Sequence, residues 1–143
     1  MTNKIAIIHV DGGSRGNPGP AGAGAVIKIG TEIQATVSKF LGTTTNNVAE
    51  YTGLVLALEK ALHLGIKQVD VYMDSELAVK QMKGIYRVKN DKLIPLHAKA
   101  KILAAKFQSF KISHVRREYN KDADRLANEA MDNAQSAQYS DSL

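Results

Sequence analysis

The 143-residue sequence contains no cysteine, no tryptophan and only three prolines. The absence of cysteine excludes disulfide scaffolds, thiolate zinc sites, iron–sulfur clusters and cysteine nucleophiles. No apolar run reaches the roughly 18 residues that cross a bilayer, and the first residues form no signal-peptide pattern. From these absences we expect a cytoplasmic protein that does not bind membranes.

The residues that are present describe an ordinary globular chain with an uneven distribution of charge. Hydrophobic residues make up 44% of the sequence and charged residues 23%, and the formal net charge is +5. Residues 80–121 hold twelve Lys and Arg but only two acidic residues, so the rest of the chain carries an acidic excess. The basic segment predicts a polyanionic partner, although a solvated surface would show the same pattern.

The pattern of apolar residues predicts one α/β domain over residues 1–134. Runs rich in Ile, Val and Ala at residues 4–11, 21–29 and 32–41 predict three antiparallel strands, and residues 12–20 form a turn-rich cluster. Helical spacing at residues 48–64, 75–82, 92–107 and 120–134 alternates with strand patterns at 68–73 and 110–115. Together they predict a mixed sheet flanked by helices. The polar residues 135–143 we expect to be a disordered tail.

Four acidic side chains fall where these elements bring side chains together. Asp11 and Asp74 stand at the carboxyl ends of two predicted strands, which is the edge where open sheets bind ligands. Glu50 and Asp124 lie on the apolar stripes of their helices, where a charged residue is rarely buried unless it is paired or binds a metal. Each aspartate taken alone also suits a turn or a helix cap.

Taken together, the four carboxylates predict a divalent cation site. The sequence offers no matching set of buried Lys or Arg partners, and hard oxygen ligands without cysteine favour Mg²⁺ or Mn²⁺. Two such ions about 3.5–4 Å apart promote in-line attack on phosphodiesters. An acidic metal site in a basic protein therefore predicts an enzyme that cuts a nucleic acid.

The motifs around these residues resemble those of type I ribonuclease H, in the branch that lacks a basic handle. They are Val10–Gly19, Asn46–Tyr51, Asp74–Glu76 and Asn120–Asn128. The resemblance covers nearly the whole chain and implies a ribonuclease H-like fold, with a five-stranded mixed sheet of three antiparallel and then two parallel strands. It implies a monomeric endonuclease that hydrolyses the RNA strand of an RNA–DNA hybrid to 5′-phosphate and 3′-hydroxyl products. Two Mg²⁺ or Mn²⁺ ions would bind together with the substrate.

The same resemblance assigns roles to single residues. The family's four metal-binding carboxylates match Asp11, Glu50, Asp74 and Asp124. Positions that match its contacts to the hybrid's minor groove are Gly12, Gly13, Ser14, Asn17, Asn46 and Glu76, and Thr45 falls near its DNA-phosphate pocket. A wide minor groove that displays 2′-hydroxyls lets such groups recognise RNA without reading sequence. The glycines and asparagines also suit ordinary turns and helix caps.

The sequence departs from the best-known members of the family in three ways. Only residues 84–91 join the two helices between which those members carry a basic handle. Glu76 replaces a common glutamine, and Arg117 stands in a loop where those members have a mobile histidine. We interpret Arg117 as a catalytic residue that steadies phosphate charge or helps to expel product. A solvated arginine that binds backbone phosphate is the alternative.

Two other functions fit the same sequence. A related nuclease that acts on double-stranded RNA or another duplex would carry the same four carboxylates. A non-catalytic hybrid-binding module would keep the basic segment, but modules of that class usually lack one or more metal ligands. All four candidate ligands are present here.

Overall fold

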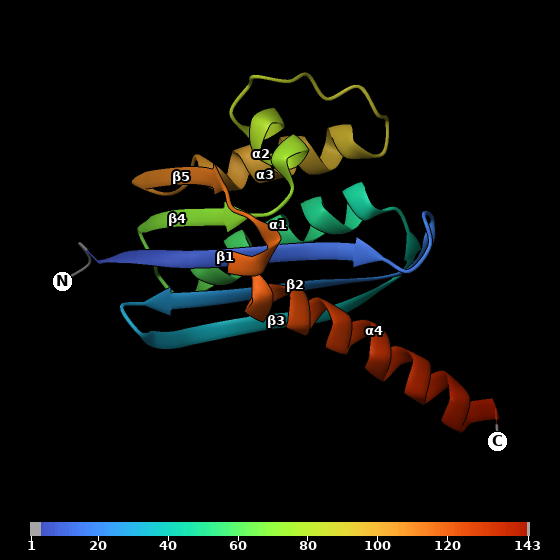
Figure 1. Cartoon of the computed structure of the whole chain (residues 1–143). Coiled ribbons are helices and arrows are strands. Elements are labelled where there is room, and N and C mark those ends of the chain that lie inside the picture. The colour runs from blue at the N-terminus through green and yellow to red at the C-terminus, as the bar shows by residue number, and fades with distance from the viewer. Residues whose placement is uncertain (1–3, 143) are drawn as a thin grey trace.

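The computed structural model describes the backbone of residues 4–142 and the side chains of residues 4–135. Its centre is a five-stranded sheet with the order β3-β2-β1-β4-β5 (Figure 1). Strands β1 (Ile5–Ser14), β2 (Gly19–Ile29) and β3 (Glu32–Thr44) form an antiparallel meander. Strands β4 (Gln68–Met73) and β5 (Ser109–His114) continue the sheet parallel to β1. The predicted α/β class, with three antiparallel and then two parallel strands, is confirmed.

Helices cover both faces of this sheet. On one face lie α1 (Asn46–His63) and α3 (Leu93–Ala104), with the short α2 (Glu76–Met82) beside them, and α4 (Lys121–Ser142) crosses the opposite face (Figure 1). A 3₁₀ turn, η1 (Arg117–Tyr119), links β5 to α4 and was not predicted. Within residues 4–142, no helix is both long and apolar enough to cross a membrane.

The core forms between β1 and α1. Alternate residues of β1, namely Ala6, Ile8 and Val10, are completely buried, and so are Leu54 and Leu58 on the helix. Burial of each large aliphatic side chain contributes about 1.5–3 kcal/mol relative to exposure. β1 is therefore the central strand of the sheet, as its continuous apolar run predicted.

Strand β1 continues through Gly12 and Gly13, where the sequence analysis predicted a turn. These glycines pair with Ala23 and Gly22 of β2, and the bend between the two strands is confined to residues 15–18. A Cβ atom on Gly12 would lie 2.3 Å from the carbonyl oxygen of Ala49. The prediction of a turn from residue 12 was wrong because the glycine serves a close approach of α1 to β1.

Helix α4 lies equally close to β2. A Cβ atom on Gly24 would lie 2.3 Å from the carbonyl oxygen of Ala123, so a larger residue there would push the helix away from the sheet. The helix continues to Ser142, whereas the sequence predicted its end at residue 134; no glycine or proline interrupts it. Side chains after Gln135 lie outside the described residues, and the disordered tail stays a prediction.

Candidate active site

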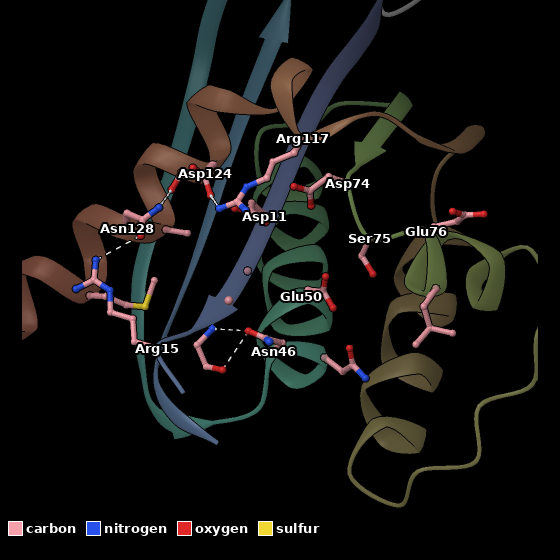
Figure 2. Close-up of a pocket in the computed structure, with 17 residues that line it drawn as sticks. Asp11, Arg15, Asn46, Glu50, Asp74, Ser75, Glu76, Arg117, Asp124 and Asn128 are labelled. Carbon is pink, nitrogen blue, oxygen red and sulfur yellow. Dashed lines mark hydrogen bonds and ion pairs between the residues drawn. The ribbon is translucent and has the colours of Figure 1, made fainter. Parts of the chain in front are cut away.

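One pocket of about 670 Å³ opens at the edge of the sheet where β4 ends. The side chains of Asp11, Glu50, Asp74 and Asp124 all line it, and they come from β1, α1, the end of β4 and α4 (Figure 2). The pocket is also lined by six other predicted site residues: Gly12, Gly13, Ser14, Asn46, Glu76 and Arg117. The fold therefore brings together residues that are up to 113 positions apart, from Asp11 to Asp124.

Asp11 and Asp74 occupy equivalent places beyond the parallel part of the sheet. Asp74 directly follows β4, as predicted, whereas Asp11 lies within β1 rather than at its carboxyl end. The last pair in the register of β1 and β4 joins Val10 to Met73. Each aspartate therefore stands one residue past this pair, which places both at the same edge.

Asp11 is the most enclosed of the four carboxylates, with 9% of its surface exposed. Burial, the negative charge of Asp74 and a hydrogen bond shared with Asp124 raise the pKa of Asp11 to about 8. When carboxylates are crowded together without a cation, one of them takes up a proton, and this lowers the negative charge of the cluster. The ionised form of Asp11 would therefore be stabilised by a cation bound in the pocket.

Glu50 enters the pocket from the first half of α1. The hydroxyl of Thr45 caps this helix by accepting a hydrogen bond from the Val48 N–H at 3.3 Å. Burial is the main cause that raises the pKa of Glu50 to about 7; a hydrogen bond with Ser75 opposes it, and the charge of Asp74 adds to it. Glu50 is therefore a second carboxylate whose charge is poorly compensated by the protein.

Arg117 contacts this group from the rim of the pocket. Its guanidinium lies 3.6 Å from a carboxylate oxygen of Asp124, yet 80% of the Arg117 side chain is exposed (Figure 2). Burial raises the pKa of Asp74, while a hydrogen bond with Asp11 and the charge of Arg117 lower it without cancelling the rise. An exposed arginine compensates little of the buried charge, because water screens it.

A set of hydrogen bonds connects the end of β1 to the start of α1. The side-chain oxygen of Asn46 accepts from the backbone N–H of Ser14 at 2.7 Å and from its hydroxyl at 3.1 Å. The side-chain oxygen of Asn17 accepts from the Asn46 N–H at 3.1 Å. Asn17 and Thr45 thus support the pocket from outside and do not line it. Thr45, rather than Asn46, is the helix cap.

Several lining residues were not predicted: Arg15, Asn47, Ser75, Leu77, Ala127, Asn128 and Met131. Arg15 pairs with Asp132 at 2.7 Å and donates to Asn128 at 3.3 Å, and it thereby ties the bend after β1 to α4. Asn128 follows Asp124 by four residues, and this helical spacing was the signal available in the sequence. The contact of Arg15 with a helix more than 110 residues away had no local signal.

The donor set suits Mg²⁺ or Mn²⁺, since five carboxylates (the four predicted ligands and Glu76) and no thiol or imidazole line the pocket. The raised pKa values of Asp11 and Glu50 point the same way, because bound cations would favour the charged form of both. Within the described side chains, no three acidic or histidine residues stand close enough to form a ready-made metal cluster. The four carboxylates fit these cations in kind and in location.

Comparisons with known proteins agree on one family. The sequence model of a family described as reverse transcriptase-like matches residues 9–130. The ribonuclease HI of Halobacterium salinarum is 41% identical over 127 residues, which make up 88% of this chain and 64% of that protein.

Solved structures extend the likeness to three dimensions. The N-terminal RNase H domain of a Mycobacterium tuberculosis protein has a TM-score of 0.87 and 46% identity, covering 89% of this chain and 98% of that domain. LC11 RNase H1, isolated from compost and solved in complex with an RNA/DNA hybrid, has a TM-score of 0.86 and 44% identity, with coverage of 91% and 99%. The chain spans only 36% of the full mycobacterial protein.

Proposed function

The chain belongs to the ribonuclease H family, and from this premise we propose that it is an endonuclease that hydrolyses the RNA strand of RNA–DNA hybrids. The observation that carries the proposal is the meeting of Asp11, Glu50, Asp74 and Asp124 in one pocket of a chain with net charge +5. The likeness to a structure solved with an RNA/DNA hybrid supports the choice of substrate.

Substrate would lie across the pocket and contact the end of β1 and the start of α1, which are joined by hydrogen bonds. Gly13 carries no side chain, and a Cβ atom there would meet only the side-chain oxygen of Asn46 at 3.8 Å, so this part of the backbone is open to close approach by a sugar; the side-chain direction of Gly12 is filled by α1. Ser14 engages the side-chain oxygen of Asn46, which leaves the Asn46 amide nitrogen free to donate to a 2′-hydroxyl or a base edge. These contacts would select RNA by its 2′-hydroxyls and would read no sequence.

The four carboxylates would hold the catalytic cations. When bound, two Mg²⁺ or Mn²⁺ ions supply activation of the attacking water and stabilisation of the leaving 3′ oxygen, which yields 5′-phosphate and 3′-hydroxyl ends. Asp11 is the innermost ligand candidate because it is the most buried of the four. Glu50 would close the set from the α1 side.

Arg117 would act on the phosphate from the rim of the pocket. Its exposed side chain touches Asp124 and is free to move toward a phosphate oxygen. A guanidinium is always charged and offers a fork of donors that suits phosphate. We assign Arg117 to steadying phosphate charge or to helping product leave.

Cleavage of matched duplexes tests the proposed function. Uniform RNA–DNA, RNA–RNA and DNA–DNA duplexes of one sequence would be incubated with Mg²⁺ or Mn²⁺ and either wild-type protein or Glu50→Gln. We expect cuts only in the RNA strand of the hybrid, with 5′-phosphate ends and with the variant inactive. Equal cleavage of RNA–RNA would support a broader nuclease, and binding of the hybrid without any cleavage would support a non-catalytic module.

A further inference from the structure

Two hydrogen bonds attach the segment between β5 and α4 to the sheet. The two residues that accept them are partners in neighbouring strands. The Val115 N–H donates to the carbonyl oxygen of Met73 at 2.9 Å, and the side-chain nitrogen of Asn120 donates to the carbonyl oxygen of Val10, also at 2.9 Å. Val10 and Met73 are the last partners in the parallel register of β1 and β4. Each of them directly precedes a carboxylate of the pocket, Asp11 or Asp74.

Asn120 is hydrogen-bonded to β1, to η1 and to the first turn of α4. Its backbone N–H donates to the carbonyl oxygen of Arg117 at 2.9 Å and closes η1. Its own carbonyl oxygen accepts from the N–H of Asp124 at 3.0 Å, in the first turn of α4. Asn120 does not line the pocket itself, so any effect on the chemistry must pass through the residues that it holds.

The buried side-chain amide of Asn120 is not explained by a contribution to folding stability alone. The residue is 1% exposed, and within the described part of the chain its side-chain oxygen has no hydrogen-bond partner. A buried polar atom without a partner costs free energy, so this half of the amide works against folding. The side-chain nitrogen is the part of the amide that makes a hydrogen bond, to the Val10 carbonyl oxygen. Because a carbonyl oxygen can only accept, this contact also identifies which end of the amide is the nitrogen.

We propose that Asn120 is a positioning residue of the carboxylate pocket. By holding the start of α4 on β1, its side-chain nitrogen sets the separation of Asp11 and Asp124, and it keeps Arg117 over the same edge. The inference rests on the proposed function, since the separation matters only if these carboxylates bind cations together. Small displacements of ligands and of groups that orient them typically cost about 10- to 100-fold in metal affinity or rate.

The test compares Asn120→Ala and Asn120→Ser with wild type. Both changes remove the side-chain nitrogen that donates to Val10 and leave the backbone bonds of residue 120 in place. Ile27→Val, a change at a buried residue of β2 that does not line the pocket, serves as the control for a general loss of stability. Steady-state cleavage of an RNA–DNA hybrid would be measured, together with Mn²⁺ binding to the substrate-free protein by electron paramagnetic resonance and Tm for each protein.

We expect both Asn120 variants to fold, to lose about 10- to 100-fold in kcat and to bind Mn²⁺ about 10-fold more weakly, with KM for the hybrid within twofold of wild type. Ile27→Val should keep the wild-type kcat, KM and Mn²⁺ affinity. A purely structural role would lower Tm alone. Wild-type kcat and Mn²⁺ affinity in a folded Asn120 variant would overturn the proposal, and so would failure of both variants to fold.

The two hypotheses fail in different ways. Wild-type protein that binds Mn²⁺ without cutting the hybrid would contradict the proposed function, and the Mn²⁺ affinities of the variants would still decide the role of Asn120. Active wild-type protein with equally active Asn120 variants would contradict only the positioning role. Wild-type protein that neither cuts nor binds Mn²⁺ would overturn both.

Discussion

Asn46 and Ser14 are joined by two hydrogen bonds to a single acceptor, the side-chain oxygen of Asn46, at 2.7 and 3.1 Å. The pair links the last residue of β1 to the first residue of α1, directly beside the carboxylates. Because the oxygen is occupied, the amide nitrogen is the end that remains for a substrate.

Replacement of this asparagine should therefore weaken substrate binding more than chemistry. We expect Asn46→Ala to raise KM for the hybrid about 10-fold, the loss of about one hydrogen bond, with kcat within threefold of wild type. Steady-state kinetics on a labelled hybrid would measure both values. Asn133→Ala, an exposed asparagine of α4 outside the pocket, is the matched control. An unchanged KM in Asn46→Ala would contradict the assigned contact.

The raised pKa values predict how stability depends on pH in metal-free protein. The pKa of Asp11 is raised to about 8 and that of Glu50 to about 7, above their ordinary values of 3.8 and 4.5. The folded state therefore binds more protons than the unfolded state between about pH 4 and 8, and its stability falls as pH rises through this window.

Urea unfolding in EDTA at pH 5.5 and 8.5 measures this effect. We expect the difference in unfolding free energy between wild type and Asp11→Asn to change by on the order of 2 kcal/mol, with wild type losing more at pH 8.5. Added Mg²⁺ should restore part of the loss, because it binds the ionised carboxylates of the folded state. A constant difference between the two proteins at both pH values would contradict the prediction.

The basic segment predicts a steep dependence of hybrid binding on salt. Each phosphate contact contributes about −0.7 to −0.9 to the slope of log K against log salt. Arg87 and Lys89 are exposed in the connection between α2 and α3. We expect the double change Arg87→Ala with Lys89→Ala to flatten the slope by about 1 to 2. Titrations by fluorescence anisotropy at several salt concentrations would show it.

The control for the salt experiment is Lys60→Ala with Lys67→Ala. Both lysines are exposed but lie outside the basic segment of residues 80–121. This pair should leave the slope unchanged. Equal slopes in all three proteins would contradict a role of the α2–α3 connection in binding.

Arg117 should affect catalysis in a way that its neighbour does not. We expect Arg117→Ala to lower the multiple-turnover rate about 10-fold, as the loss of one charged contact to phosphate would. A similar loss under single-turnover conditions would indicate that Arg117 steadies phosphate charge, and a preserved single-turnover rate would indicate product release. Arg116→Ala is the control, since Arg116 pairs with Glu118 and does not line the pocket. Unchanged rates under both conditions would contradict a catalytic role.

Much of the site could be predicted because its carboxylates stand at positions where the local sequence pattern predicts apolar, buried residues or the end of a buried strand. Glu50 and Asp124 are charged residues on apolar helical stripes, and Asp74 ends a buried strand. The structure places all three in the predicted pocket with Asp11. Local spacing also predicted β4 with its observed bounds, and the central place of β1.

Features that depend on distant partners could not be predicted. Gly12 suggests a turn in the sequence, but its role depends on the approach of Ala49 from α1. The link from Asn120 to Val10 joins a side chain to a backbone atom 110 positions away, and no periodicity encodes such a contact. Likewise, Arg15 reaches α4 only because the bend after β1 and the helix meet in the folded chain.

Cleavage of a labelled RNA–DNA hybrid by wild-type protein and by Asp11→Asn, with Mg²⁺, with Mn²⁺ and with neither, tests the proposed activity most directly. We expect metal-dependent cuts in the RNA strand, at a rate that Asp11→Asn lowers about a thousandfold or more. In EDTA at pH 8.5, where the Asp11 carboxyl is ionised, the Tm of Asp11→Asn should lie above that of wild type because a buried, crowded charge is removed. Absence of cleavage by folded wild-type protein with either metal, or undiminished cleavage by Asp11→Asn, would contradict metal-dependent hydrolysis of the hybrid at this pocket.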